Sequence, residues 1–337
     1  MEAPRPTNDL FNPLRRSALA LRAILLVAPH VNAQTTLAFP NKPVRIIVGF
    51  AAGAGPDVLA RLLAQKLSER WGNIGVIIDN KPGAGGLIAA SEAARAAPDG
   101  YTLLLGVTGN LIIAPASYSK LPYDPVKDFV PVSQVVSNDF VLLSNPNVPA
   151  TNVKEFVAWS AKQPKGIFMG TFGAGTPGHF AAYIFGDAVK LKPEVVHYKN
   201  TGDALLGLIS GDVQGMFGSV GVATSNVKAG KLVALAATGP SRNPALPDVS
   251  TMKEQGYGNL EITSWFGIVA PTRTPEDVVA RLSADIQKVV KAPDTQAQFE
   301  AAGFTATGTT REEFARIIAS DTLVWGKAVR STGFKAD

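Results

Sequence analysis

Three glycine-containing loops are the parts of this sequence whose residue types could do chemistry. They span residues 50–57, 106–110 and 171–179, and each follows an apolar run and precedes a segment with helical patterning. Glycine lets the main chain approach a ligand closely, and the first N–H groups of a helix lack an intrahelical partner and carry partial positive charge. The loops therefore indicate places where a carboxylate or phosphate could bind.

Other chemistries find little support in the sequence. The absence of cysteine excludes thiolate catalysis, disulfides and Cys-containing zinc sites, and three histidines argue against a His-rich metal site. Gly173, Gly175 and Gly178 have the G-x-G-x-x-G spacing of dinucleotide-binding loops, but the following run, 193–199, does not end in the acid that binds a ribose. No P-loop or G-x-S-x-G motif occurs. We therefore expect no cofactor, no metal and no catalytic residue.

Two ionisable residues in these loops have alternative interpretations. His179 falls in the first turn of a predicted helix, where its neutral ring could donate to an anion or could simply pack and cap the helix. Asp57, at the end of the first loop, is interpreted as the N-cap of the helix that follows this loop rather than as a catalytic carboxylate. His197 lies in an apolar strand, which favours a structural role.

The order of elements predicts an α/β fold. Short β-branched runs, several of them apolar on both faces, alternate with helical patterns, as in a mostly parallel sheet covered by helices. The predicted strands span residues 44–50, 75–80, 101–107, 140–145, 167–172, 193–199, 213–219 and 232–238. Predicted helices span residues 57–70, 86–97 and 178–189, and Thr176 with Pro177 forms the N-cap and first position of the third. The stretches 122–131 and 240–247 are interpreted as Pro-rich connectors.

The C-terminal part predicts two amphipathic helices. Thr274 caps the first, whose apolar side chains between 278 and 290 recur at helical spacing until Pro293. Thr310 and Glu313 have the spacing of a capping box at the start of the second.

The composition is that of a globular protein of about two domains. Of 337 residues, 46% are apolar and 18% charged, which excludes a disordered or coiled-coil chain. The formal net charge of +5 is dispersed and never forms a long run of one sign. That pattern argues against a nucleic-acid partner.

Residues 1–33 predict an export signal. Arg15 and Arg16 precede an apolar run, and small residues ending at Ala33 provide a cleavage site. We expect the signal peptide to be removed and the mature protein to be periplasmic.

An ordered set of motifs covers essentially the whole mature chain. It comprises Phe39-Pro40-Asn41-Lys42-Pro43, Asn80-Lys81-Pro82-Gly83-Ala84-Gly85-Gly86, Pro98-Asp99-Gly100-Tyr101, Leu121-Pro122-Tyr123-Asp124-Pro125, Gly175-Thr176-Pro177-Gly178-His179 and Trp265-Phe266-Gly267. In this order the sequence resembles the Bug receptors, the extracytoplasmic solute-binding components of tripartite tricarboxylate transporters.

The resemblance implies a two-lobed, type II-like periplasmic binding protein, each lobe a mixed, mostly parallel sheet flanked by helices. Residues 36–139 plus 264–337 would form lobe 1, and residues 140–263 lobe 2. Main-chain groups would hold a dicarboxylate, tricarboxylate or aromatic carboxylate in the cleft, and the protein would act as a monomer with a membrane permease or a sensor kinase. The implied ligand-binding residues are Phe50, Ala51, Ala52, Gly53, Gly55, Asp57, Thr108, Gly109, Asn110, Gly173, Gly175, Thr176, His179, Tyr198 and Ser219.

One departure from the family bears on the ligand. Gly218 and Ser219 stand where the family commonly has an aspartate that can meet an amine, so a simple or aromatic carboxylate is favoured over an amino acid. Two alternatives stay open at this level: a secreted enzyme using His179, Asp57 or Glu261 as a base, and a sensory module without transport.

Overall fold

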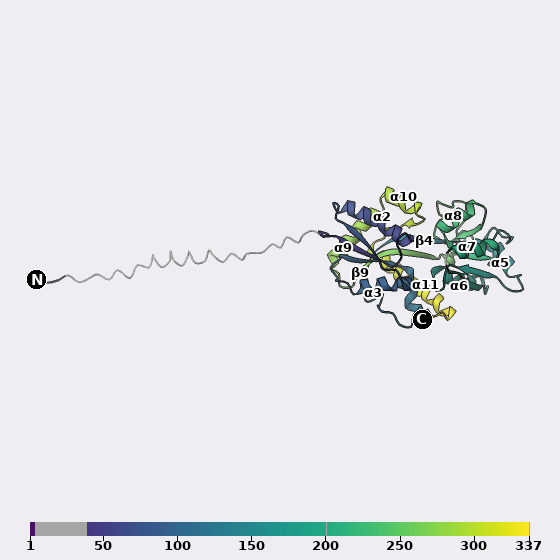
Figure 1. The fold of residues 1–337 in the computed structure, drawn as a ribbon, viewed down its shortest axis with the longest axis horizontal. Coiled ribbons are helices and arrows are strands. Elements are labelled where there is room, and N and C mark those ends of the chain that lie inside the picture. The colour runs from purple at the N-terminus through teal and green to yellow at the C-terminus, as the bar shows by residue number, and fades with distance from the viewer. Residues whose placement is uncertain (4–38, 200, 337) are drawn as a thin grey trace. The chain divides into compact units, whose positions relative to one another are not determined.

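The computed structural model describes residues 1–3, 39–199 and 201–336, and residues 39–337 form one unit (Figure 1). The predicted signal peptide lies almost entirely outside the described residues. The strands are β1 (Val44–Val48), β2 (Val76–Asn80), β3 (Thr102–Val107), β4 (Phe129–Ser144), β5 (Phe168–Thr171), β6 (Glu194–His197), β7 (Gly215–Ser219), β8 (Val233–Ala237), β9 (Thr263–Pro271) and β10 (Thr305–Ala306).

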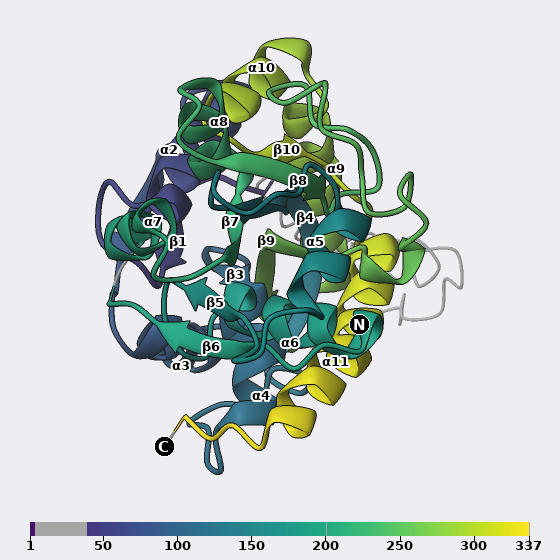
Figure 2. The ribbon, with the colours of Figure 1, turned by 90° about the vertical axis from the view of Figure 1, so that its right-hand side faces the viewer.

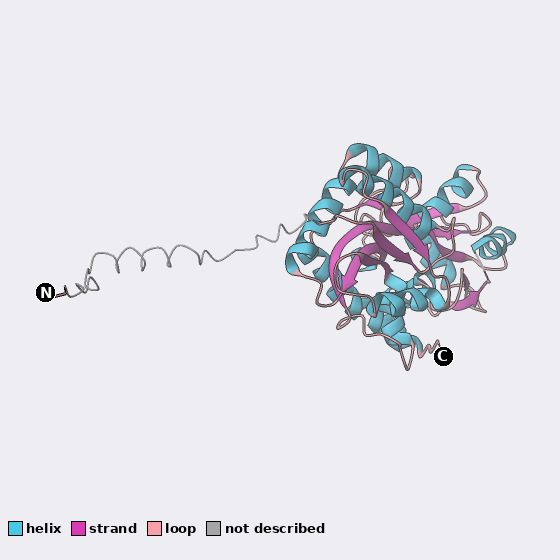
Figure 3. Ribbon diagram, turned by 60° about the vertical axis from the view of Figure 1, so that its left-hand side comes forward, coloured by secondary structure: helices cyan, strands magenta, loops and turns pink. Residues whose placement is uncertain are grey.

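The described helices alternate with these strands over most of the chain. They are α2 (Gly55–Arg70), α3 (Leu87–Ala94), α4 (Ala114–Ser117), α5 (Val153–Ser160), α6 (Pro177–Val189), α7 (Thr201–Ser210), α8 (Val220–Lys228), α9 (Glu276–Val290), α10 (Pro293–Ala301) and α11 (Arg311–Thr332), with the short helical turns η2 (Ala84–Gly86), η3 (Gly109–Ile113) and η4 (Gly258–Leu260). Helices lie on either side of the strands (Figure 3). None of the described helices is long and apolar enough to cross a membrane.

The sheet has two halves that share β4. Its order is β2-β1-β3-β9-β4-β7-β5-β6, with β8 and β10 also pairing with β4. The first part of β4 pairs with β9, and its last residues, from Phe140 on, pair with β7 and β8. Pairing is parallel among β1, β2 and β3 and among β5, β6 and β7, and antiparallel around β4 and β9. The α/β prediction is confirmed, with parallel strands outside and antiparallel strands at the centre.

All eight predicted strands are present, but the first part of β4 and the whole of β9, which join the halves, were not predicted. The first part of β4 begins inside the stretch 122–131, which the sequence had suggested was a connector, and no strand was expected at β9. Both contain residues that break a simple apolar pattern, such as Pro131 in β4 and Gly267 in β9. Their strand conformation depends on pairing with each other, which local patterning does not reveal.

The described core consists of three apolar clusters, one of which joins the two halves. One lies between the first half of the sheet and helices α2 and α9, and another packs α7 and α8 on the second half. The third includes Leu104 of β3, Leu142 of β4, Phe185 of α6 and Phe314 of α11, so it spans both halves. Fully burying each such side chain stabilises the fold by roughly 1.5–3 kcal/mol.

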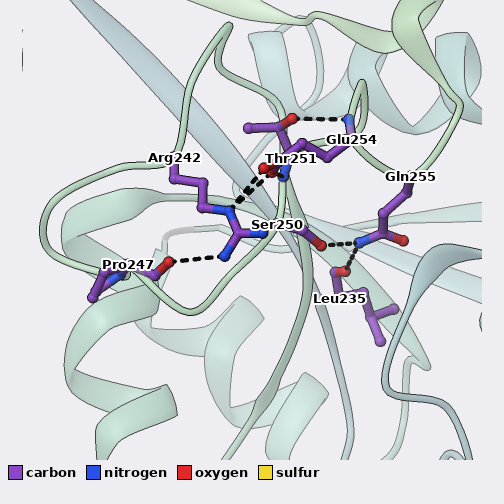
Figure 4. A network of polar contacts seen from close by, with 7 residues as sticks. All are labelled: Leu235, Arg242, Pro247, Ser250, Thr251, Glu254 and Gln255. Atoms are coloured by element: carbon purple, nitrogen blue, oxygen red, sulfur yellow. Dashed lines mark hydrogen bonds and ion pairs between the residues drawn. The ribbon is translucent and has the colours of Figure 1, made fainter.

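The connection from β8 to β9 is held by polar contacts (Figure 4). Arg242 Nε donates to both carboxylate oxygens of Glu254 at 3.0 Å, and Glu254 also accepts from the Thr251 N–H at 2.6 Å. Gln255 Nε2 donates to the Leu235 carbonyl of β8 at 2.7 Å. Because exposed ion pairs contribute little, the contact of Gln255 with the strand is the stronger anchor.

Two of the four predicted helix caps are present. Thr176 accepts from the His179 N–H, and Thr310 with Glu313 forms the predicted capping box. The prediction that Thr274 caps α9 is wrong. Its hydroxyl donates to the Pro271 carbonyl at 2.7 Å instead, and Pro275 occupies the N-cap position without a side-chain bond.

Replacing Thr310 by alanine should lower the free energy of unfolding by about 1 kcal/mol, because the Glu313 N–H loses its acceptor at 3.1 Å. Urea unfolding followed by circular dichroism measures this change. Thr322→Ala in the same helix is the control, since its hydroxyl donates to a carbonyl already within the helix. An equal loss in both variants would contradict a capping role for Thr310.

Candidate functional site

A cavity of about 590 Å³ lies between the two halves of the sheet. Its described lining residues come from both halves and from the strands that join them. They are Phe50, Pro56, Ala84, Gly85, Leu87, Val107, Thr108, Gly109, Ile113, Ala114, Ser117, Tyr118, Asn138, Phe140, Phe172, Ala174, Gly175, Thr176, Pro177, Thr201, Ser264, Trp265, Phe266 and Ala336. The size and largely apolar lining are those of a small-molecule site.

The structure brings parts of all three predicted loops to this cavity. Phe50, Thr108, Gly109, Gly175 and Thr176 line it. The other predicted site residues do not line it; they are Ala51, Ala52, Gly53, Gly55, Asp57, Asn110, Gly173, His179, Tyr198 and Ser219.

Asp57 organises the first loop from within. Its buried carboxylate accepts from the Gly53 N–H at 2.8 Å, from Arg61 Nε at 2.9 Å and from Asn80 Nδ2 at 2.9 Å. The hydrogen bond from Arg61, with help from the other two, lowers the pKa of Asp57 to about 2. An ionised carboxylate with three internal partners is a structural group, not a free base.

The prediction that Asp57 is the N-cap of α2 is wrong. The helix begins at Gly55, so Ala54 is the N-cap and Asp57 is the third helical residue. From there the carboxylate reaches back to Gly53, whose φ of +81° suits glycine. Ala51, Ala52 and Gly53 are exposed at the tip of the loop.

Thr108 and Asn110 are the buried polar residues of the second loop. Thr108 Oγ1 accepts from the Trp265 N–H at 2.9 Å, and its hydroxyl hydrogen has no acceptor within the described chain. Asn110 is fully buried beside it, where its Oδ1 accepts from the Val107 N–H at 3.0 Å. Its Nδ2 finds no partner among the described residues and lies against Gly86.

The third loop is held by internal hydrogen bonds. The Gly175 N–H donates to His179 Nδ1 at 3.0 Å, and the Thr176 hydroxyl donates to the Gly173 carbonyl at 2.7 Å. Burial, with a smaller effect of His197, lowers the pKa of His179 to about 4. Of the two interpretations of His179, the structure therefore favours packing and loop support, with a neutral ring.

Tyr198 and Ser219 lie in the second half and do not line the cavity. The Tyr198 hydroxyl lies so close to Gly207 that a Cβ there would approach it to 2.1 Å. Ser219 pairs with Phe140 across β7 and β4 and precedes α8.

Five of the lining residues that sequence reasoning missed lie on the two joining strands. Asn138 of β4 and Ser264 of β9 are paired, and Asn138 Nδ2 donates to Ser264 Oγ at 3.3 Å. The next residue of β9, Trp265, is buried and donates from Nε1 to Asp321 Oδ2 at 2.8 Å. Burial raises the pKa of Asp321 to about 6. The Trp265-Phe266-Gly267 motif was the one sequence feature that could have pointed to lining residues on these two strands.

The C-terminal segment connects the two halves beside the cavity. Helix α11 runs along α6 toward α4 (Figure 2). Beyond it, the Phe334 ring lies 5.1 Å from the His179 ring and 5.7 Å from that of Phe180, measured between centroids. The Ala336 N–H donates to the Ser117 carbonyl of the first half at 2.9 Å. The loop that contains Gly175 is thus covered by Phe334.

The described wall of the cavity contains no Asp, Glu, Lys, Arg or His side chain. The three candidate bases lie elsewhere, since Asp57 and His179 have internal partners and Glu261 is exposed, 3.6 Å from Lys253. The described residues also include no cluster of His, Asp and Glu side chains that could hold a metal ion. Neutral groups must therefore do the binding at this wall.

Residues 59–334 match the sequence profile of the tripartite tricarboxylate transporter family receptor. A UPF0065 protein from the tcbD–tcbE intergenic region of Pseudomonas sp. strain P51 is 32% identical over 95% of either chain. Among solved structures, periplasmic binding protein BugD is 30% identical with a TM-score of 0.70, over 88% of this chain and 99% of that one. MatC from Rhodopseudomonas palustris with bound malate is also 30% identical, with a TM-score of 0.70, over 86% of this chain and 100% of that one. These likenesses confirm the two-lobed fold of periplasmic binding proteins.

The contribution of His179 to stability should fall as the pH is lowered from 6.5 toward 4, because the unfolded chain takes up a proton at His179 that the folded chain excludes. His179→Phe removes this contribution, so its stability should change less over that range. At pH 7 the variant should lose about 1 kcal/mol with the Gly175 hydrogen bond. Urea unfolding at pH 7, 5.5 and 4.5 tests this, and identical pH dependence in both proteins would contradict it.

Proposed function

We propose that this chain, which belongs to the tripartite tricarboxylate transporter receptor family, captures a small carboxylic acid between two lobes for delivery to a membrane permease. The observation that carries the proposal is one cavity, lined from both halves of the sheet, whose described wall has polar groups but no ionised side chain. MatC, a relative of the same fold, holds malate.

The two lobes in this proposal are residues 36–139 plus 264–337 and residues 140–263. The boundaries coincide with the change of partners along β4, whose pairing with β9 extends to Asp139 and whose pairing with β7 begins at Phe140. Opening and closing would bend the chain at β4 and β9. A ligand that contacts both lobes favours the closed form.

Neutral hydrogen-bond donors hold the carboxylate in this proposal. The Thr108 hydroxyl and the main-chain N–H groups of Ala174 and Thr176 belong to lining residues and have no acceptor within the described chain. A hydrogen bond to a charged acceptor contributes roughly 1.5–3 kcal/mol, so a few of them can bind an anion. They avoid the desolvation of a buried cationic side chain.

The acid is bound and released without chemical change in this proposal, because no candidate base lines the described wall. The basic and apolar residues within 1–33 support export and removal of a signal peptide, after which the protein acts in the periplasm as a monomer. A sensor in place of a permease would use the same pocket.

Native mass spectrometry of freshly purified protein should detect a bound small organic acid, released on denaturation. An amine, a sugar or a nucleotide in its place would contradict the proposed ligand class. Incubation of the released acid with the protein should return it unaltered, and formation of a product would favour an enzyme.

Gly175→Val should weaken acid binding at least about tenfold, because the new side chain presses on the Phe334 ring and displaces the loop that lines the cavity. Gly166→Val is the matched control. Both glycines have positive φ, +76° and +72°, so both variants carry similar backbone strain, but Gly166 is exposed and does not line the cavity. Isothermal titration with a panel of carboxylic acids measures the difference. Equal weakening by both variants would contradict this placement of the ligand.

A further inference from the structure

We infer that residues 333–336, here called the strap, join the two lobes in the absence of a ligand and must detach before the cavity opens. The inference rests on the two-lobe motion of the proposed function but not on the identity of the acid. Two attachments carry it, one to each lobe, and both lie beside the cavity.

The strap leaves the end of helix α11, which belongs to the proposed lobe 1. Gly333 ends this helix with a φ of +66°, a left-handed conformation that suits glycine and turns the chain away from the helix. The Phe334 N–H then donates to Thr332 Oγ1 at 3.1 Å. The turn places the Phe334 ring against α6 of lobe 2.

The attachment to lobe 2 is the half-buried Phe334 ring. It makes edge-to-face contacts with His179 and Phe180, with interplanar angles of 81° and 73°, and such contacts are favourable beyond the burial of apolar surface. A Cβ at Gly175 would lie 3.4 Å from the same ring. Because the Gly175 N–H donates to His179 Nδ1, the ring covers both the loop that lines the cavity and the side chain that supports this loop.

The attachment to lobe 1 is a main-chain hydrogen bond. The Ala336 N–H donates to the carbonyl of Ser117, the last residue of α4, at 2.9 Å. Ser117 is buried, and its hydroxyl donates to the Ile113 carbonyl at 3.0 Å, so the acceptor is held firmly by lobe 1. Both Ala336 and Ser117 line the cavity.

The short distance between the two attachments makes the strap a constraint on opening. An extended chain reaches about 3.3–3.6 Å per residue, so the Cα atoms of Phe334 and Ala336 cannot lie more than about 7 Å apart. Opening moves Gly175 in lobe 2 away from Ser117 in lobe 1, and one attachment must then break. Since the other residues of the strap are exposed, few contacts are lost and the release is reversible. The strap therefore favours the closed form before any ligand binds.

The distance between the lobes can be measured with two spin labels, because the chain has no cysteine of its own. Ile88→Cys in α3 and Leu206→Cys in α7 place the labels at side chains that are 52% and 66% exposed. The first residues of these two helices line the cavity from opposite lobes. Double electron–electron resonance is recorded on protein freed of acid by unfolding, dialysis and refolding. With the strap intact, we expect the short distance to predominate.

Two variants detach the strap, one at each end. Phe334→Ala removes both edge-to-face contacts and should raise the ratio of long to short distances at least about threefold. Ala336→Pro should act in the same direction, since proline lacks the N–H that bonds to Ser117. Thermal melts establish that the variants fold, and Phe334→Leu replaces the alanine variant if that one does not.

Each variant has a matched control. Leu323→Ala truncates a side chain of α11 that is 72% exposed, and Ala336→Ser keeps the main-chain N–H. Both controls should leave the ratio of long to short distances unchanged.

The outcomes are distinct from those of the proposed function. A larger share of the long distance in both strap variants, with none in the controls, supports the inference. Identical distance distributions in all the proteins would overturn it, and so would equal increases in strap variants and controls. Because no acid takes part, these results leave acid capture to be decided by native mass spectrometry.

Discussion

The binding of an anion by neutral groups is the constraint on which the rest of this site depends. A buried carboxylate needs hydrogen-bond donors aimed at it, and in the described wall none of them can come from an ionised side chain. Each neutral donor contributes little binding free energy by itself. Several donors must therefore be held in place before the ligand arrives. The internal bonds of the loops supply that order, as the Gly53 contact with Asp57 and the Gly175 contact with His179 illustrate.

The joining strands provide the second requirement, a floor of the cavity that belongs to both lobes. Strands β4 and β9 carry Asn138, Phe140, Ser264 and Trp265 into the cavity wall while pairing with strands of both halves. Helix α11 supports this floor through Asp321, and the segment after it reaches both halves. Because the floor and the loops come from different parts of the chain, the site exists only in the complete two-lobed fold.

The strands and helix caps were easier to predict from the sequence than the residues that line the cavity. The eight β-branched runs and the caps at Thr176 and Thr310 follow local rules, and all of them occur in the structure. The strand β9 was missed because its burial comes from pairing with β3 and β4, far away in sequence. The loops could be recognised from their glycines, but which residues face the cavity depends on loop geometry. Asp57 and His179 illustrate this, since each turns inward to a main-chain N–H.

A crystal structure of the protein with a bound carboxylic acid tests the central claim most directly. The carboxylate oxygens should lie about 2.7–3.1 Å from Thr108 Oγ1 and from main-chain nitrogens of the loop that contains Gly175. A carboxylate paired with an arginine, lysine or protonated histidine, or bound outside this cavity, would contradict the claim.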